Sequence, residues 1–153
     1  MIRTLVSLLA TAAVLLALGC APSPDSPRGF VLPAGDVESG RQAFIDLQCY
    51  ACHRINGVDL PQFMGSAPVA VVLGGERTRV RTYGELVTSI VNPSHRLVVG
   101  FPAEQVSRDG ESLMPVLNGV MTVQQLIDIV ALLQSSYEIA PPTDEAYSYR
   151  YEY

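Results

Sequence analysis

The chain has 153 residues and a formal net charge of −5, with 15 acidic residues against 10 basic ones, and every basic residue is Arg. This composition offers no basic stripe of the kind that nucleic acid requires, so no nucleic-acid partner is expected. Three Cys are too few for a disulfide framework.

Residues 1–19 have the pattern of a secretory signal peptide. Arg3 precedes an apolar run from Leu5 to Leu18 that is short for a membrane span. The segment ends Leu-Gly-Cys20, which resembles the bacterial lipoprotein signal, in which the Cys becomes the acylated first residue of the mature protein. The alternative is an uncleaved signal anchor in which Cys20 is an incidental apolar residue. Both readings predict a folded part held at a membrane, on the periplasmic side.

Residues 20–35 are predicted to be a tether that starts at the lipid-anchor Cys20. The segment contains Pro22, Pro24, Pro27 and Pro33. Pro-rich segments stay extended and do not pack a core.

The folded domain is predicted to span residues 36–137, which is roughly the length of one domain. Helices are expected over 36–48, with Asp36 as N-cap, and over 82–91 and 122–136, each opened by a capping box. The long segments 54–81 and 94–120 are predicted to be loops that wrap a bound group. Residues 138–153 form an acidic, Tyr-rich tail that is predicted to be flexible, or else to contact a partner.

The motif Cys49-Tyr50-Ala51-Cys52-His53 is the attachment pattern of a c-type haem. Two thiols three positions apart can each bond one vinyl group on the same porphyrin edge, and the following His then lies under the iron. A zinc site would need about four ligands, and only His95 remains as a distant candidate. A redox-active dithiol would need a βαβ context, which the sequence does not suggest. We therefore predict one covalent haem c bound by Cys49, Cys52 and His53.

Over residues 36–136 the chain resembles the monohaem class I cytochromes c. The resemblance implies an all-α fold of three or more helices with long loops around the haem. It also implies that Gly40 and Phe44 are contact residues of the first helix. In the last helix, Leu132 or Leu133 stands where the family has an aromatic residue.

The same resemblance implies the remaining haem contacts. It assigns the backbone carbonyl of Pro68 to the second ring nitrogen of His53, and the sixth iron position to Met114, which is followed by Pro115 as in the family. Met121 is expected to pack in the core, and Met64 lies too close to the motif to reach over the haem. His95 is expected on the surface, although a bis-His haem stays open as an alternative.

A haem held by His53 and Met114 has no open iron position, so the predicted function is one-electron transfer and not catalysis. The chain would be a membrane-tethered carrier between redox proteins, or a dedicated haem subunit of an oxidoreductase. The alternatives are a gas-binding or sensing haem protein with a labile sixth ligand, and a lipoprotein whose C-x-x-C holds zinc or a disulfide.

Overall fold

The structure is a computed structural model that describes residues 30–67, 69–78 and 81–139. Its helices and strands all belong to the unit that begins at Leu32. In chain order they are α2 (Val37–Asp46), a 3-10 turn (Cys49–Ala51), β1 (His53–Ile55), β2 (Val71–Leu73), β3 (Gly75–Arg77), α3 (Tyr83–Val91), a 3-10 turn (Pro93–His95), α4 (Ala103–Val106), β4 (Ser107–Arg108), β5 (Glu111–Ser112), α5 (Val123–Ser135) and β6 (Tyr137–Ile139).

The three predicted helices are confirmed, and their first turns have the expected caps. The Asp36 side chain accepts a hydrogen bond from Ser39 N at 2.7 Å and so begins α2. Complete capping boxes open the other two helices, from Thr82 and Glu85 for α3 and from Thr122 and Gln125 for α5. These side chains satisfy N–H groups that have no partner within the helix.

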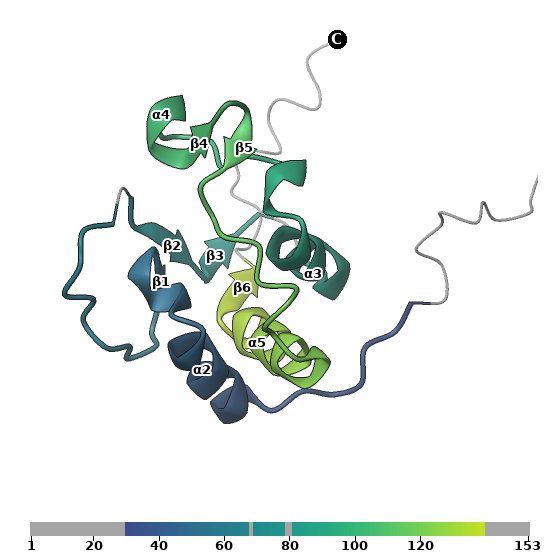
Figure 1. Cartoon of the computed structure of the whole chain (residues 1–153). Coiled ribbons are helices and arrows are strands. Elements are labelled where there is room, and N and C mark those ends of the chain that lie inside the picture. Colours follow the sequence, from purple (N-terminus) through teal and green to yellow (C-terminus); the bar gives the residue numbers. More distant parts are fainter. Residues whose placement is uncertain (1–29, 68, 79–80, 140–153) are drawn as a thin grey trace, which may run out of the picture. The chain divides into compact units, whose positions relative to one another are not determined.

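Helices α2 and α5 pack side by side and form the centre of the fold (Figure 1). A Cβ added to Gly40 of α2 would overlap the backbone oxygen of Asp128 and lie 3.0 Å from Cβ of Leu132, both in α5. Only a residue without a side chain allows the two backbones to approach this closely. The expectation that Gly40 is a helix-contact residue is confirmed, and the contact lies against Asp128 and Leu132 of α5.

The hydrophobic core is built mainly from these two helices. α5 supplies half of the buried hydrophobic side chains, and Phe44 of α2 is only 2% exposed. The core cluster consists of Ala43, Phe44, Ile55, Leu86, Ile129, Val130, Leu132 and Leu133. Val123, which the sequence pattern places on the apolar stripe of α5, is exposed at the first turn.

The prediction of an all-α fold is wrong, because the described residues also contain six short strands. β1 pairs with β2 and β3 with β6, both in parallel, whereas β4 and β5 form an antiparallel pair. Each strand has only two or three residues, which is too short to show the alternating apolar pattern of a longer strand. The parallel pairs also join segments far apart in the sequence, so no local turn signal announces them.

Two consecutive glycines carry the chain from one parallel pair to the other. Gly74 lies between β2 and β3 and Gly75 begins β3, and both have positive φ angles, of 78° and 74°. Gly75 N donates to Ser136 O at 2.8 Å, which brings β3 alongside β6 just after α5. β6 contains Glu138 and Ile139, two residues that the sequence analysis placed in the tail.

No helix in the described part of the chain is both long and apolar enough to cross a membrane. The predicted signal peptide, the anchor Cys20 and most of the tether lie outside the described residues, as does the tail from residue 140 onward.

Candidate functional site

The C-x-x-C-H motif forms a tight turn directly after α2. The helix ends at Asp46, and Gln48 adopts the left-handed conformation with φ of 58°. Ala51 N then donates to Gln48 O at 3.0 Å, and Cys52 N donates to Cys49 O at 3.3 Å. This single turn brings Cys49, Cys52 and His53 together at the end of the helix, as the spacing predicts.

β1 starts at His53 itself, so a parallel strand pair holds the histidine backbone. Val71 N donates to Cys52 O at 2.9 Å, and Asn56 N donates to Leu73 O at 2.9 Å. His53 lies opposite Val71 in this pair. The sequence analysis missed this support, because it interpreted residues 54–81 as a loop.

The His53 ring is enclosed, and it keeps an unpaired nitrogen. Its centroid lies 6.4 Å from that of the buried Phe44 ring. Its Nδ1 is buried and has no hydrogen-bond partner among the described residues. Burial lowers the pKa of His53, and the nearby Val71 backbone, which approaches the ring without the geometry of a full hydrogen bond, raises it by a smaller amount. The folded chain therefore favours a neutral imidazole, which is the form that binds a metal ion.

Both motif thiols are free and half-buried. Cys49 packs against the hydrophobic core. Burial raises the pKa of Cys49 to about 11, because a thiolate would lose its hydration there. The thiolate of Cys49, which is the form that attacks disulfides, is therefore disfavoured in the folded chain.

Arg54 also belongs to this site, and sequence reasoning did not select it. Its Nη1 donates to the carbonyl oxygens of Tyr50 and His53, the latter at 2.9 Å. Tyr50 in turn meets Phe63 edge to face, with ring centroids 6.1 Å apart. A polar residue directly after the motif was a signal available in the sequence, but its role depends on a turn geometry that only the structure gives.

Met114 lies two residues after the end of β5 (Glu111–Ser112), an element that Figure 1 shows away from β1. Its N–H donates to Ser112 Oγ at 3.1 Å, and Ser112 N donates to Ser94 Oγ at 3.0 Å. These bonds anchor the Met114 backbone to the segment around Ser94. Its role as the sixth ligand stays a prediction, and Pro68 lies outside the described residues.

The other candidate ligands behave as the sequence predicts. Met121 is partly buried against the core cluster, whereas Met64 is 90% exposed. His95 is exposed on its 3-10 turn, and its Nδ1 lies 2.8 Å from the carbonyl oxygen of Asn92. The interpretation of His95 as a surface residue is confirmed.

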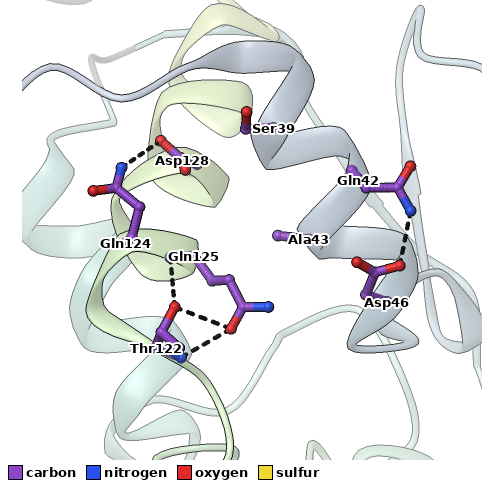
Figure 2. A pocket seen from close by; sticks show the side chains of 8 residues that line it. All are labelled: Ser39, Gln42, Ala43, Asp46, Thr122, Gln124, Gln125 and Asp128. Carbon is purple, nitrogen blue, oxygen red and sulfur yellow. Dashed lines mark hydrogen bonds between the residues drawn. The ribbon is translucent and has the colours of Figure 1, made fainter.

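A separate open pocket lies between α2 and the start of α5 (Figure 2). Its polar groups bond one another: Gln42 Nε2 donates to Asp46 Oδ1 at 2.8 Å, and Gln124 Nε2 donates to Asp128 Oδ1 at 3.0 Å. The pocket is lined by Ser39, Gln42, Ala43, Asp46, Thr122, Gln124, Gln125 and Asp128. None of the motif residues lines it, so it is not the haem site.

Asp128 in this pocket has a structural role that the sequence did not reveal. Its side chain is 6% exposed and accepts a hydrogen bond from Asp36 N at 2.9 Å. α5 thereby fixes the residue at which α2 begins. Within the described residues, no group of three or more His, Cys, Asp or Glu side chains is arranged to hold a metal ion.

The motif residues fit a covalent haem on structural grounds. Two free thiols lie on one turn, one of them in apolar surroundings, and they are followed directly by a half-buried imidazole whose Nδ1 makes no hydrogen bond to a described residue. In comparisons with known proteins, no family model, no curated protein and no solved structure matches this chain.

Proposed function

We propose that this protein carries one covalent haem c on Cys49 and Cys52, with His53 as an iron ligand, and that it transfers single electrons between redox proteins. The observation that carries the proposal is the C-x-x-C-H turn, which ends in a half-buried histidine whose buried Nδ1 makes no hydrogen bond among the described residues. A buried polar atom without a partner is costly in a folded protein. A bound haem would offset that cost in one of two ways. The iron would bind Nδ1 itself, or it would bind the other ring nitrogen while haem binding orders a carbonyl oxygen that accepts a hydrogen bond from Nδ1.

When bound, the haem would supply one iron centre that cycles between the ferric and ferrous states. The chain's own residues attach it, orient it and exclude water from it. Two thioether links would fix the ring relative to α2, since the motif turn follows that helix directly. The β1–β2 pair would hold the backbone of His53, and burial lowers its pKa, which favours the neutral imidazole that binds iron.

Met114 is proposed to close the opposite side of the iron. A His/Met pair raises the reduction potential, because the soft thioether favours ferrous iron. If His53 and Met114 both bind the iron, the iron would have no position open for a substrate. The proposed activity is therefore electron transfer without bond-making chemistry.

The anchor completes the proposal. If Cys20 is acylated, residues 20–35 form a tether between the membrane surface and the haem domain on the periplasmic side. A tethered domain can reach donors and acceptors in the same membrane, either as a carrier or as the haem subunit of one oxidoreductase complex.

The deciding experiment is to express the full chain in a host that attaches haem to C-x-x-C-H motifs and to record its visible spectra. We expect haem that stays on the chain through denaturing electrophoresis, one per chain. We also expect low-spin spectra with the weak far-red band of Met bound to ferric iron, and no reaction of the ferrous form with carbon monoxide.

Each other result has a distinct meaning. Chains without covalent haem would refute the proposal and leave the zinc or disulfide interpretation of Cys49 and Cys52. A ready carbon monoxide complex would indicate a gas-binding or sensing protein with a labile sixth ligand. A closed site without the far-red band would make His95 the sixth ligand in place of Met114.

A further inference from the structure

Arg54 lies directly after the proposed iron ligand His53 and is half-buried. Its guanidinium turns back along the chain, where Nη1 donates to the carbonyl oxygens of both Tyr50 and His53. One charged group therefore links the middle of the C-x-x-C turn to the residue that ends the motif.

The two carbonyl groups have no obvious partner in the regular structure around them. The 3-10 hydrogen bonds of the motif turn stop at Cys52, where the chain enters β1. Along β1, Cys52 O and Asn56 N bond to β2. Because peptide groups alternate in direction along a strand, His53 O faces away from β2. Arg54 supplies the donor that the strand pair cannot.

We propose that Arg54 is the positioning residue of the haem ligand: its guanidinium locks the Tyr50 and His53 carbonyls, and so fixes the angle at which the His53 imidazole meets the iron. This inference rests on the proposed function. Groups behind a metal ligand orient it and tune the metal, so a change at Arg54 should appear in the properties of the iron.

The positive charge of Arg54 has a second consequence. Arg stays protonated at all physiological pH values. A fixed cation beside the axial histidine disfavours ferric haem, which carries one more positive charge than ferrous haem. Arg54 is therefore expected to raise the reduction potential as well as to set the ligand angle.

The test compares haem-loaded wild type with Arg54→Met and Arg54→Lys, by electron paramagnetic resonance of the ferric form and by redox titration. The resonance reports the orientation of the axial imidazole, which a purely structural change elsewhere would not move. For Arg54→Met we expect altered g values, a lower potential and a smaller share of chains that carry covalent haem. For Arg54→Lys we expect altered g values with a potential close to that of wild type, because the charge is kept.

Arg77→Met is the matched control. Arg77 Cζ lies 5.5 Å from the Tyr137 ring centroid and Nη1 donates to Glu76 O, so its removal deletes the same charge from a side chain that contacts β6 and not the motif carbonyl groups. Its g values and potential should equal those of wild type. An equal fall in potential in Arg77→Met would overturn the inference, because the effect would then come from net charge alone.

Wild-type g values and potential in Arg54→Met would also overturn it. If Arg54→Met does not accumulate, the Lys variant decides: altered g values support the positioning role, and unchanged g values refute it. Absence of covalent haem in the wild type would instead refute the proposed function, so the two failures are distinguishable.

Discussion

The helix pair α2–α5 and the motif segment Cys49–Arg77 are built on different principles. The two helices contact each other directly. Gly40 of α2 lies against Leu132 of α5, and the backbone at the start of α2 donates a hydrogen bond to Asp128 of α5. The motif segment contributes one fully buried hydrophobic residue to the core, Ile55. It also contains two free thiols and the unpaired Nδ1 of His53.

The comparison separates the part of the fold that packs against itself from the part that offers groups for binding. A helix pair with a well-packed apolar seam is stable through burial and close contact. The motif segment places two thiols and an imidazole beside the core. Among the described residues, the thiols form no disulfide and the imidazole Nδ1 makes no hydrogen bond. It has the composition of a binding site, supported on one side by the helix pair.

The largest expected effect comes from removing both thiols. The double variant Cys49→Ala/Cys52→Ala should lose all covalent haem and most of the folded protein, because the motif segment then lacks the group that completes it. Haem staining after denaturing electrophoresis and circular dichroism measure the two effects. Retention of a native far-ultraviolet spectrum at full yield would show that the motif segment folds without haem and would break the comparison.

Met114→Leu should affect the iron and leave the fold in place. We expect covalent haem to remain, the ferrous form to bind carbon monoxide, and the reduction potential to fall by a sizeable part of the roughly 0.8 V range that axial ligands control. Absorption spectra and redox titration test this. An unchanged spectrum and potential would mean that Met114 is not the ligand.

Gly40→Ala tests the helix pair directly. The added Cβ would overlap the Asp128 backbone, so we expect a loss of about 1–3 kcal/mol in the free energy of unfolding. Gly119→Ala is the control, since a Cβ there meets nothing within 4 Å, and should change stability by less than about 0.5 kcal/mol. Urea unfolding followed by circular dichroism compares them, and equal stabilities would show that the seam is looser than described.

The smallest expected effect is the pH dependence at the start of α2. The hydrogen bond from Ser39 N lowers the pKa of Asp36 below its ordinary value of 3.8. A depressed pKa gives stability that is present above the unfolded value and is lost as the pH falls through the folded value. Asp36→Asn, which keeps an acceptor oxygen without the charge, should therefore unfold with a shallower pH dependence below about pH 4. Parallel urea midpoints in acid for the two proteins would contradict this.

The sequence by itself determined where α2, α3 and α5 begin and where the motif lies, but not α4, which falls in the segment 94–120 that was predicted to be a loop. Asp36, Thr82 and Thr122 announce helix starts within a few residues of the groups that they cap, and the spacing of Cys49, Cys52 and His53 places them on one turn. These features are local, so the physical causes lie within reach of a short stretch of sequence. The β4–β5 hairpin also has a local cause, because Asp109-Gly110 is a turn signal and both residues have positive φ. It was not predicted, because strands of two residues show no alternating apolar pattern.

Only the tertiary structure decided the rest. The parallel pairs β1–β2 and β3–β6, the bond from Asp36 to Asp128 and the two carbonyl groups held by Arg54 all depend on how distant or turning segments meet. A sequence pattern reports periodic burial along one segment. The pattern does not report which distant segments pair through their peptide groups. Those pairings are what make the observed fold mixed and not all-α.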